Sequence, residues 1–274
     1  MSANATTIAF DRLAARYDAL ASGDLFRRMR QTTHAVFARR FAAGSRVLEI
    51  GCGTGLDTVF LAARCRHVVA CDPSEEMVTQ TLRRLAHGDL LARVTVMPCG
   101  LQDLRAYLEA LAPPEPFDAI VSNFGALNCV RHLAPLGALA CRHLRPGGVV
   151  LIGLMSRSCA LEWLYFSARG RFRLATRRLG RGAVAVPVAG IDVPTFYHRI
   201  GDVRLALGHG FRLAGVTGIG VLTPPPYLEP RWQQLPPAIR ALVRRVDRTL
   251  AGIPPLNRLG DHVLLQFVRE RGDG

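Results

Sequence analysis

Lysine is missing from this sequence of 274 residues, and all 35 basic side chains belong to arginine. The net charge of +14 is of the kind that favours a nucleic-acid partner. A complete replacement of lysine by arginine, however, indicates a biased codon supply as much as a selection for contacts with phosphates. The charge alone therefore does not identify a nucleic-acid-binding protein.

Three other common signals are also absent. The seven cysteines are odd in number and none is spaced as C-x-x-C, so we expect reduced thiols and no zinc or redox site. No apolar run approaches the roughly 18 residues of a membrane-spanning helix. The N-terminus lacks the basic-then-apolar layout of a secretory signal. These absences predict a cytoplasmic protein with no bound metal.

Short apolar runs alternate with helical segments through most of the chain. The runs predict strands at 46–50, 67–72, 93–97, 117–122, 147–155, 210–219 and 261–269. Strands of this length that alternate with helices are typical of a parallel sheet covered on both faces. The sequence therefore predicts a doubly wound α/β fold.

The most informative stretch is VLEIGCGTG, in which a strand ends in a glycine-rich turn. Gly51, Gly53 and Gly55 lack β-carbons, so the backbone can approach a ligand closely. A dinucleotide fingerprint needs its third glycine at position 56, which is Leu56 here. The preceding Glu49 would repel a pyrophosphate and attract a cationic ligand.

This E-x-G-x-G-x-G turn resembles motif I of the class I S-adenosylmethionine-dependent methyltransferases, whose cofactor carries a sulfonium and an ammonium group. Asp72 ends the second predicted strand, 23 residues after Glu49, where a carboxylate can accept both ribose hydroxyls. CDPSEEM is similar to the family's D-x-S-x-x-M segment, which places Met77 beside adenine. FDRLAARYD (10–18) and HLRPGGVVLIG (143–153) resemble segments of the ubiquinone- and menaquinone-biosynthesis branch.

The resemblance covers about residues 8–155 and implies S-adenosyl-L-methionine as the cofactor. The implied cofactor-binding residues are Tyr17, Arg30, Glu49, Gly51, Cys52, Gly53, Gly55, Asp72, Pro73, Met77, Gln102, Asp103, Asn123 and Phe124. Tyr17 would close over the methionine end, and Arg30 would pair with the cofactor's carboxylate. A packed tyrosine and a solvated arginine are the alternatives. Gln102 or Asp103 would contact the adenine.

We expect one domain over residues 1–274, built on a Rossmann-like, seven-stranded sheet that is mostly parallel with an antiparallel last strand. Its expected parts are N-terminal helices (1–45), a cofactor-binding core (46–155), an inserted acceptor cap (156–200) and a C-terminal half of the sheet with a Pro-rich connector (201–274). Within the cap, the pattern predicts a helix at 160–166 and a small hairpin within 183–199.

Methyl transfer from a sulfonium is an in-line displacement of an already activated group, so the protein mainly has to orient the reactants and exclude water. No catalytic dyad is needed. A hydroxyl or an acidic carbon as acceptor would benefit from a general base. His198 is the first candidate, with Tyr197, Tyr165 and His209 as further ones; the alternative is that His198 has no catalytic role.

The inserted cap is where the family commonly builds its acceptor site. The residues expected to contact the acceptor are Asn128, Trp163, Tyr165, Tyr197 and Tyr227. The acid-free, arginine-rich stretch 169–181 suggests an anionic group on an apolar acceptor such as a quinone, a lipid or a polyketide-like molecule, and a peripheral contact with a membrane surface. The alternatives are a plain core helix followed by a solvated basic loop, and an Asn128 that caps the following helix.

Two other functions compete with small-molecule methylation. An RNA or DNA methyltransferase fits the charge, but its Pro-Pro-Tyr signature should follow the fourth strand, where Ser122-Asn123-Phe124-Gly125 stands. The tetrad Pro224 to Tyr227 follows the sixth strand instead, as a stiff connector whose Tyr227 could form a pocket wall. A binding or scaffold protein that keeps the fold without transferring a methyl group is the other alternative. The sequence does not indicate an oligomeric state.

Overall fold

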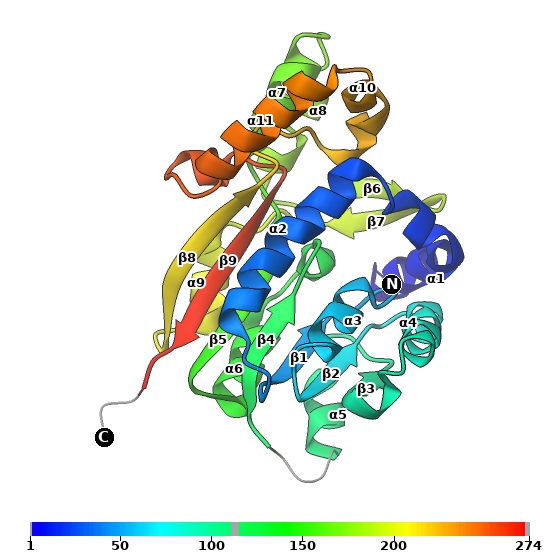
Figure 1. Ribbon diagram of the computed structural model, residues 1–274, viewed down its shortest axis with the longest axis vertical. Coiled ribbons are helices and arrows are strands. Elements are labelled where there is room, and N and C mark those ends of the chain that lie inside the picture. The colour runs from blue at the N-terminus through cyan, green and yellow to red at the C-terminus, as the bar shows by residue number, and fades with distance from the viewer. Residues whose placement is uncertain (1, 111–114, 272–274) are drawn as a thin grey trace.

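A seven-stranded sheet forms the centre of the molecule (Figure 1). The computed structural model describes residues 2–110 and 115–271. The strand order is β3-β2-β1-β4-β5-β9-β8, with β1 (Arg46–Ile50), β2 (His67–Cys71), β3 (Val94–Met97), β4 (Phe117–Ser122), β5 (Leu144–Met155), β8 (Phe211–Ile219) and β9 (His262–Arg269). Strands β1 to β5 are parallel, and β9 is antiparallel to both neighbours. The predicted doubly wound α/β fold with an antiparallel last strand is confirmed.

One face of the sheet is covered by α2 (Asp24–Arg40), α3 (Leu56–Ala62) and α4 (Glu75–His87). These helices contribute Phe37, Leu61 and Leu85, all fully buried, to a core that also contains Val47 of β1. The next residue, Leu48, belongs to the core on the opposite face. This alternation, together with strands that are apolar throughout, is what a sheet buried on both faces requires.

The opposite face is covered by α5 (Leu104–Ala110), α6 (Ala134–His143) and α9 (Ile200–Leu207). Helices α6 and α9 approach each other very closely at Gly137, where a β-carbon would stand 1.7 Å from the carbonyl oxygen of Ala206. Only glycine permits this contact. A short 3₁₀ segment, η1 (Leu91–Arg93), precedes β3.

The carboxyl ends of β1, β2 and β4 lie at one edge of the sheet because these strands are parallel and adjacent. The glycine turn follows β1, Asp72 follows β2, and Asn123 follows β4. Ligands of open α/β sheets bind at this edge. The topology therefore brings the glycine turn, Asp72 and Asn123 together at one edge of the sheet.

Two helices, α1 (Ser2–Leu20) and α2, make up the N-terminal region predicted to be helical. The first free N–H groups of α2 find their partner far away in the chain. The carboxylate of Glu229 accepts hydrogen bonds from the backbone N–H of Asp24 (3.1 Å) and of Leu25 (2.9 Å). Glu229 thus caps α2 from the C-terminal connector.

The segment after β5 contains the helix and the hairpin expected for the cap. It comprises α7 (Ala160–Ser167), α8 (Phe172–Ala175), η3 (Arg177–Leu179) and an antiparallel hairpin of β6 (Val184–Val188) and β7 (Ile191–Thr195). The hairpin lies beside α1 (Figure 1), and Pro194 of β7 shares a cavity wall with Thr7 of α1.

The Pro-rich connector is largely helical, whereas the prolines predicted a stiff connector. It contains η4 (Pro226–Leu228), α10 (Glu229–Gln233), α11 (Pro237–Leu250) and η5 (Leu256–Arg258). The ring of Tyr227 stacks on Phe166 of α7 with 6.3 Å between centroids, and 48% of the residue is exposed. Tyr227 therefore packs against the outer cap.

The arginine-rich stretch 169–181 does not present all of its charge to solvent. Arg169 lies over the ring of Tyr165, 3.8 Å from its centroid, while Arg177 and Arg178 form ion pairs inside the cap. The stretch 169–181 contains no acidic residue, but Glu162 and Asp261 from other segments neutralise part of its positive charge. Over residues 2–110 and 115–271, no helix combines the length and the apolar character needed to cross a bilayer.

Arg178 joins the cap to the sheet. It is 4% exposed, and its guanidinium pairs with Glu162 of α7 and, at 2.7 Å, with Asp261 immediately before β9. Arg177 also pairs with Glu162, at 2.7 Å. Cys159, Glu162 and Asp261 converge closely enough to hold a metal ion, but the Arg178 guanidinium already neutralises these carboxylates. All seven cysteines are free thiols.

Arg178→Met leaves Glu162 and Asp261 buried without their shared cation. We expect this change to lower the free energy of unfolding by roughly 3–5 kcal/mol, the usual cost of breaking a buried ion pair from one side. Arg66→Met is the matched control, because both side chains of its ion pair with Glu115 are exposed, at 57% and 48%, and the change should cost less than about 1 kcal/mol. Denaturant titration compares the two, and equal losses would contradict the buried-pair explanation.

Candidate functional site

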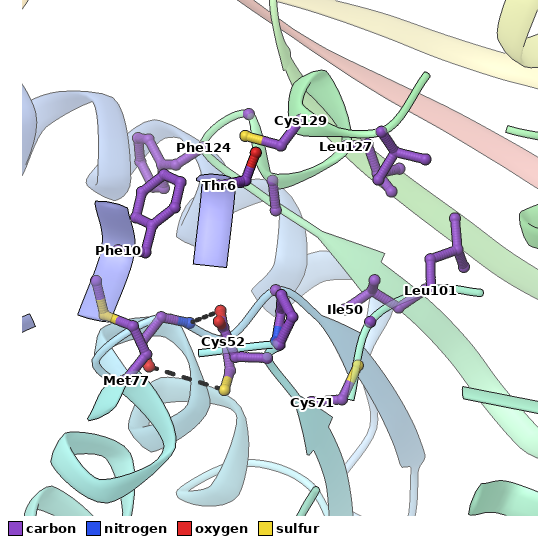
Figure 2. Close-up of a pocket in the computed structure, with 18 of the residues that line it drawn as sticks. Thr6, Phe10, Ile50, Cys52, Cys71, Met77, Leu101, Phe124, Leu127 and Cys129 are labelled. Atoms are coloured by element: carbon purple, nitrogen blue, oxygen red, sulfur yellow. Dashed lines mark hydrogen bonds between the residues drawn. The ribbon is translucent and has the colours of Figure 1, made fainter. Parts of the chain in front are cut away.

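A cavity of about 410 Å³ opens at the carboxyl ends of β1, β2 and β4 (Figure 2). Its walls come from α1, α2, the turn after β1, the end of β2 and the loops after β3 and β4, with the exit of β7 at the outer end. In Figure 2, Phe10 of α1 faces Phe124 across the upper part, while Met77 and Cys52 lie below. The cavity thus contains most of the cofactor-binding residues predicted from the sequence.

The glycine turn after β1 forms the floor. The backbone N–H groups of Gly51 and Cys52 donate to the carbonyl of Cys71, at 2.8 and 3.0 Å, which ties the turn to β2. Gly51 has φ +76°, and a β-carbon there would stand 2.3 Å from the β-carbon of Ala126. Gly53 has no other atom within 4 Å of its missing β-carbon, so this side of the turn is open to a ligand. Gly55 lies outside the cavity lining, where it begins α3 with φ +81°.

Asp72 lies at the rim of this floor and lines the cavity. One carboxylate oxygen accepts the Gly53 N–H at 2.9 Å and the other accepts the Ser74 N–H at 3.0 Å. A carboxylate has about four acceptor sites, so each oxygen can still accept a hydroxyl. Burial raises the pKa of Asp72 to about 6, although the two backbone donors oppose the rise.

A mostly apolar wall continues from Asp72. Met77 is 1% exposed, and its N–H is capped by Ser74 at the start of α4. Pro73 and Gln102 also line the cavity, whereas Asp103 does not. Of the two residues proposed to contact adenine, the structure therefore brings only Gln102 to the cavity. The neighbouring Cys99, Gly100 and Leu101 complete this wall.

Glu49 does not line the cavity. It lies behind the glycine turn, 3% exposed, and accepts a hydrogen bond from the Thr58 hydroxyl at 2.6 Å. Burial, reinforced by the nearby charge of Asp57, raises the pKa of Glu49 to about 8. Glu49 is thus predominantly protonated at neutral pH, and its expected direct contact with a cationic ligand is not what the structure shows.

Asp57, in the first turn of α3, brings a buried carboxylate to the cavity in its place. It binds Arg30, accepts from His34 Nε2 at 2.6 Å and from the Asn123 amide at 2.9 Å. Burial alone would raise the pKa of Asp57, but Arg30 and His34 hold it below its usual value. Asp57 could have been identified from the sequence, because it is an acid in the first turn of the helix that follows the glycines, where the helix dipole favours a negative charge.

Arg30, Phe124 and Tyr17 line the same end of the cavity. The Arg30 guanidinium lies over the Phe124 ring, 4.4 Å from its centroid, besides its ion pair with Asp57. The alternative of a solvated arginine is therefore wrong. Burial raises the pKa of the Tyr17 hydroxyl above its ordinary value, so Tyr17 stays neutral and can donate a hydrogen bond.

The outer end of the cavity is formed by Thr6 and Thr7 of α1, by the segment 129–132 after η2 (Ala126–Cys129), and by Pro194 and Phe196. His132 is the histidine that reaches this lining. Its only sequence signal was its place in the loop after the fourth strand.

His198 lies elsewhere. Its Nε2 is 2.9 Å from the Val130 carbonyl and its ring stacks on Phe196, with 6.3 Å between centroids. It lines a neighbouring cleft and does not line the cavity, so it is not placed as the general base there. His209 precedes β8, at the opposite edge of the sheet.

Asn128 is fully buried and does not line the cavity. Its side chain accepts from the Met155 N–H (2.9 Å) and donates to the Phe196 carbonyl (2.8 Å). Asn128 therefore connects the end of β5 to the segment after β7 by hydrogen bonds. It neither lines the cavity, as its predicted contact with the acceptor would require, nor caps the following helix.

The aromatic residues expected at the acceptor also lie outside the cavity lining. Trp163 and Tyr165 belong to α7, where Tyr165 binds Arg231. Tyr197 packs beside Arg178 with 5.4 Å from the guanidinium to the ring centroid, and Tyr227 stacks on α7. These side chains hold the cap together, and Phe10, Phe124 and Phe196 provide the aromatic walls instead.

Comparisons with known proteins agree with this geometry. Residues 47–148 match a family described as "Methyltransferase domain". A demethylmenaquinone methyltransferase of Clavibacter sepedonicus is 38% identical over 121 residues, which are 44% of each chain. A ubiquinone biosynthesis O-methyltransferase of Xylella fastidiosa is 32% identical over 125 residues, 43% of this chain and 45% of the relative. The match identifies residues 47–148 as a methyltransferase domain.

Solved structures extend the likeness in fold to nearly the whole chain. The [4+2]-cyclase SpnF has a TM-score of 0.62 at 16% identity and covers 97% of this chain and 96% of its own. The N-methyltransferase NodS of Bradyrhizobium japonicum, in complex with S-adenosyl-L-homocysteine, has a TM-score of 0.56 at 17% identity, over 97% and 98%. At such identities the likeness concerns the fold alone. The chain matches about half the length of the curated relatives named above.

The residues of the cavity fit S-adenosyl-L-methionine, the cofactor that the sequence resemblance implies. The open backbone at Gly53, the acceptor sites of Asp72 and the mixed charges of Asp57 and Arg30 correspond to a ligand with ribose hydroxyls, an ammonium and a carboxylate. Helix α1 and the hairpin enclose the remaining space.

The protonated Glu49 predicts an unusual pH dependence of stability. Between about pH 5 and 8 the folded protein keeps a proton that the unfolded chain has lost, because the pKa of Glu49 is about 8 when folded and near 4.5 when unfolded. The free energy of unfolding should therefore fall as the pH rises, by up to about 1.4 kcal/mol per pH unit from this group.

Glu49→Gln removes this dependence, so the stability of the variant relative to the parent should increase between pH 5 and pH 8 and stay constant below about pH 4. Chemical denaturation across this range measures the difference. Glu270→Gln, an exposed change of the same kind, should give a curve parallel to the parent's. A Glu49→Gln curve that is also parallel would show that Glu49 is ionised in the fold.

Proposed function

We propose that this protein transfers the methyl group of S-adenosylmethionine to a small, largely apolar acceptor, and that a quinone-type aromatic ring is the acceptor class. The observation that carries the proposal is the continuity of one cavity from Asp72 to the aromatic and threonine side chains at its outer end. Two curated relatives named above are quinone-biosynthesis methyltransferases, which supports the choice of acceptor.

Asp72 is the proposed ribose ligand. Its two oxygens are already fixed by the Gly53 and Ser74 N–H groups, so the carboxylate presents its remaining lone pairs without losing side-chain entropy. Met77 and Gln102 flank the space beyond it and would contact the adenine face and edge.

The charged group of Asp57 and Arg30 is the proposed binding site for the methionine end. Asp57 attracts an ammonium, and Arg30 can pair with a carboxylate bidentately. Asn123 and His34 hold Asp57 in place from two other elements, so the carboxylate is oriented before a ligand arrives. Tyr17 covers the same end as a neutral donor.

When bound, S-adenosylmethionine supplies an electrophilic methyl group on a sulfonium. The chain's own contribution is orientation and exclusion of water. Phe10, Phe124 and Phe196 offer flat apolar walls for an aromatic ring, and α1 also contributes Thr6 and Thr7 to the lining. His132 lines the outer end and is the proposed acceptor of a proton from the attacking hydroxyl or carbon.

Binding of S-adenosylhomocysteine should weaken in acid because Asp72 must be ionised to accept both hydroxyls. With the pKa of Asp72 at about 6, affinity should be about tenfold lower at pH 5 than at pH 8. Calorimetric titration measures this ratio. Asp72→Asn should bind weakly and with little pH dependence over the same range, and a variant that keeps the parent's affinity would exclude the ribose assignment.

Methyl transfer is tested with labelled S-adenosylmethionine and three acceptors: demethylmenaquinone in its reduced quinol form, which supplies a nucleophilic ring carbon and hydroxyls, total RNA and an organic extract of cellular metabolites. We expect label in the quinone or the organic extract. His132→Ala should lower kcat by about a hundredfold with a hydroxyl acceptor, while His209→Ala, its matched control at an exposed position before β8, should retain most activity.

Label in RNA would favour a nucleic-acid methyltransferase instead. Tight cofactor binding with no transfer to any fraction would favour a binding protein. Equal losses in the two histidine variants would remove His132 as the base.

A further inference from the structure

A second cleft of about 880 Å³ adjoins the outer end of the cavity. It lies between the start of α6, the loop 180–183 and the segment 194–199 that leads into α9. Arg131, His132, Pro194 and Phe196 line both spaces. The two therefore share one wall, and a single elongated ligand can contact both.

The cleft is strongly basic. Four arginines from four different segments line it: Arg131, Arg157, Arg181 and Arg199. Asp202 is the one acid in this lining, and it accepts the Arg199 backbone N–H at 2.7 Å. Among the described residues, no carboxylate lies within 4.0 Å of any of the four guanidiniums.

One of the four guanidiniums is fixed in the cleft. Arg157 donates to the carbonyls of Leu179 and Gly180, the latter at 3.0 Å, so its guanidinium is held against the loop. Burial first, and then the charges of Arg199 and Arg181, lower the pKa of Arg157. The charge of Asp202 opposes this shift of the pKa. Arg157, Arg181 and Arg199 therefore repel one another in the free protein, and an anion placed among them would relieve this repulsion.

We propose that this cleft binds an anionic group, a phosphate or a carboxylate, on the acceptor whose apolar part occupies the cavity. The inference rests on the proposed function and narrows its substrate to an amphiphilic molecule: an aromatic or otherwise apolar body connected to a negatively charged group. Pro194 and Phe196 form the apolar side of the shared wall, and Arg131 forms the charged side. Arg157, Arg181 and Arg199 line the cleft and do not line the cavity.

The test uses the whole protein with inorganic phosphate as one probe and acetate as the other, at an ionic strength held constant with chloride. Backbone amide NMR locates binding, with and without saturating S-adenosylhomocysteine. We expect saturable shifts confined to 131–134, 180–183 and 194–199. A stronger response to phosphate than to acetate assigns a phosphorylated acceptor, and the reverse assigns a carboxylated one.

Arg131→Gln/Arg181→Gln should weaken binding of the preferred anion at least about tenfold, because each guanidinium contributes a charge-assisted hydrogen bond. Its affinity for S-adenosylhomocysteine should stay within about twofold. Arg83→Gln/Arg245→Gln removes the same charge from exposed positions on α4 and α11 and should change neither affinity.

Shifts scattered over other arginines, or an affinity that the first double variant leaves unchanged, would overturn the anionic site while leaving the proposed function intact. Failure to bind S-adenosylhomocysteine would overturn the proposed function, and the phosphate and acetate titrations would still decide the nature of the cleft.

Discussion

The site depends on the close approach of two turns at the edge of the sheet. Gly51 after β1 and Ala126 after β4 stand so near each other that no β-carbon fits at position 51. Because the turns touch, the residues that follow each strand face one common space. Gly53 and Asp72 lie on one side of it, and Phe124 lies on the other. The left-handed backbone of Gly51 is what makes this contact possible.

The fold and the cofactor end could be predicted because they depend on local patterns. Strand periodicity, the glycine turn and the acid at Asp72 are readable over a few residues, and the parallel sheet brings them together by topology alone. Glu49 was misplaced for a physical reason. A strand alternates its side chains between faces, so the residue two positions before Gly51 points into the helix layer, where Thr58 receives it. Asp57, in the first turn of α3, is the carboxylate that lines the cavity, which is the role predicted for Glu49.

The acceptor end could not be predicted in the same way because it is assembled from segments far apart in the chain. Nothing in TFYHR distinguishes His198, turned toward the Val130 carbonyl, from a histidine that lines the cavity. Tyr165 and Tyr227 are of a residue type that often lines binding sites, but here they pack against Phe166 within the cap. The arginines also differ in their surroundings, which the sequence does not reveal. Arg178 is neutralised by buried carboxylates, whereas four other arginines line one cleft: Arg131, Arg157, Arg181 and Arg199.

The position of β9 has a consequence for synthesis of the chain. This strand, residues 262–269, pairs with β5 on one side and β8 on the other, so a segment synthesised after every other strand of the sheet fills a gap inside it. Glu229, which fixes the start of α2, also follows the first residue of that helix by 205 residues. The helix that carries Arg30 thus has no completed cap, and β5 has no outer neighbour, until these later segments have emerged from the ribosome. A translation product that stops before Glu229 lacks both contacts.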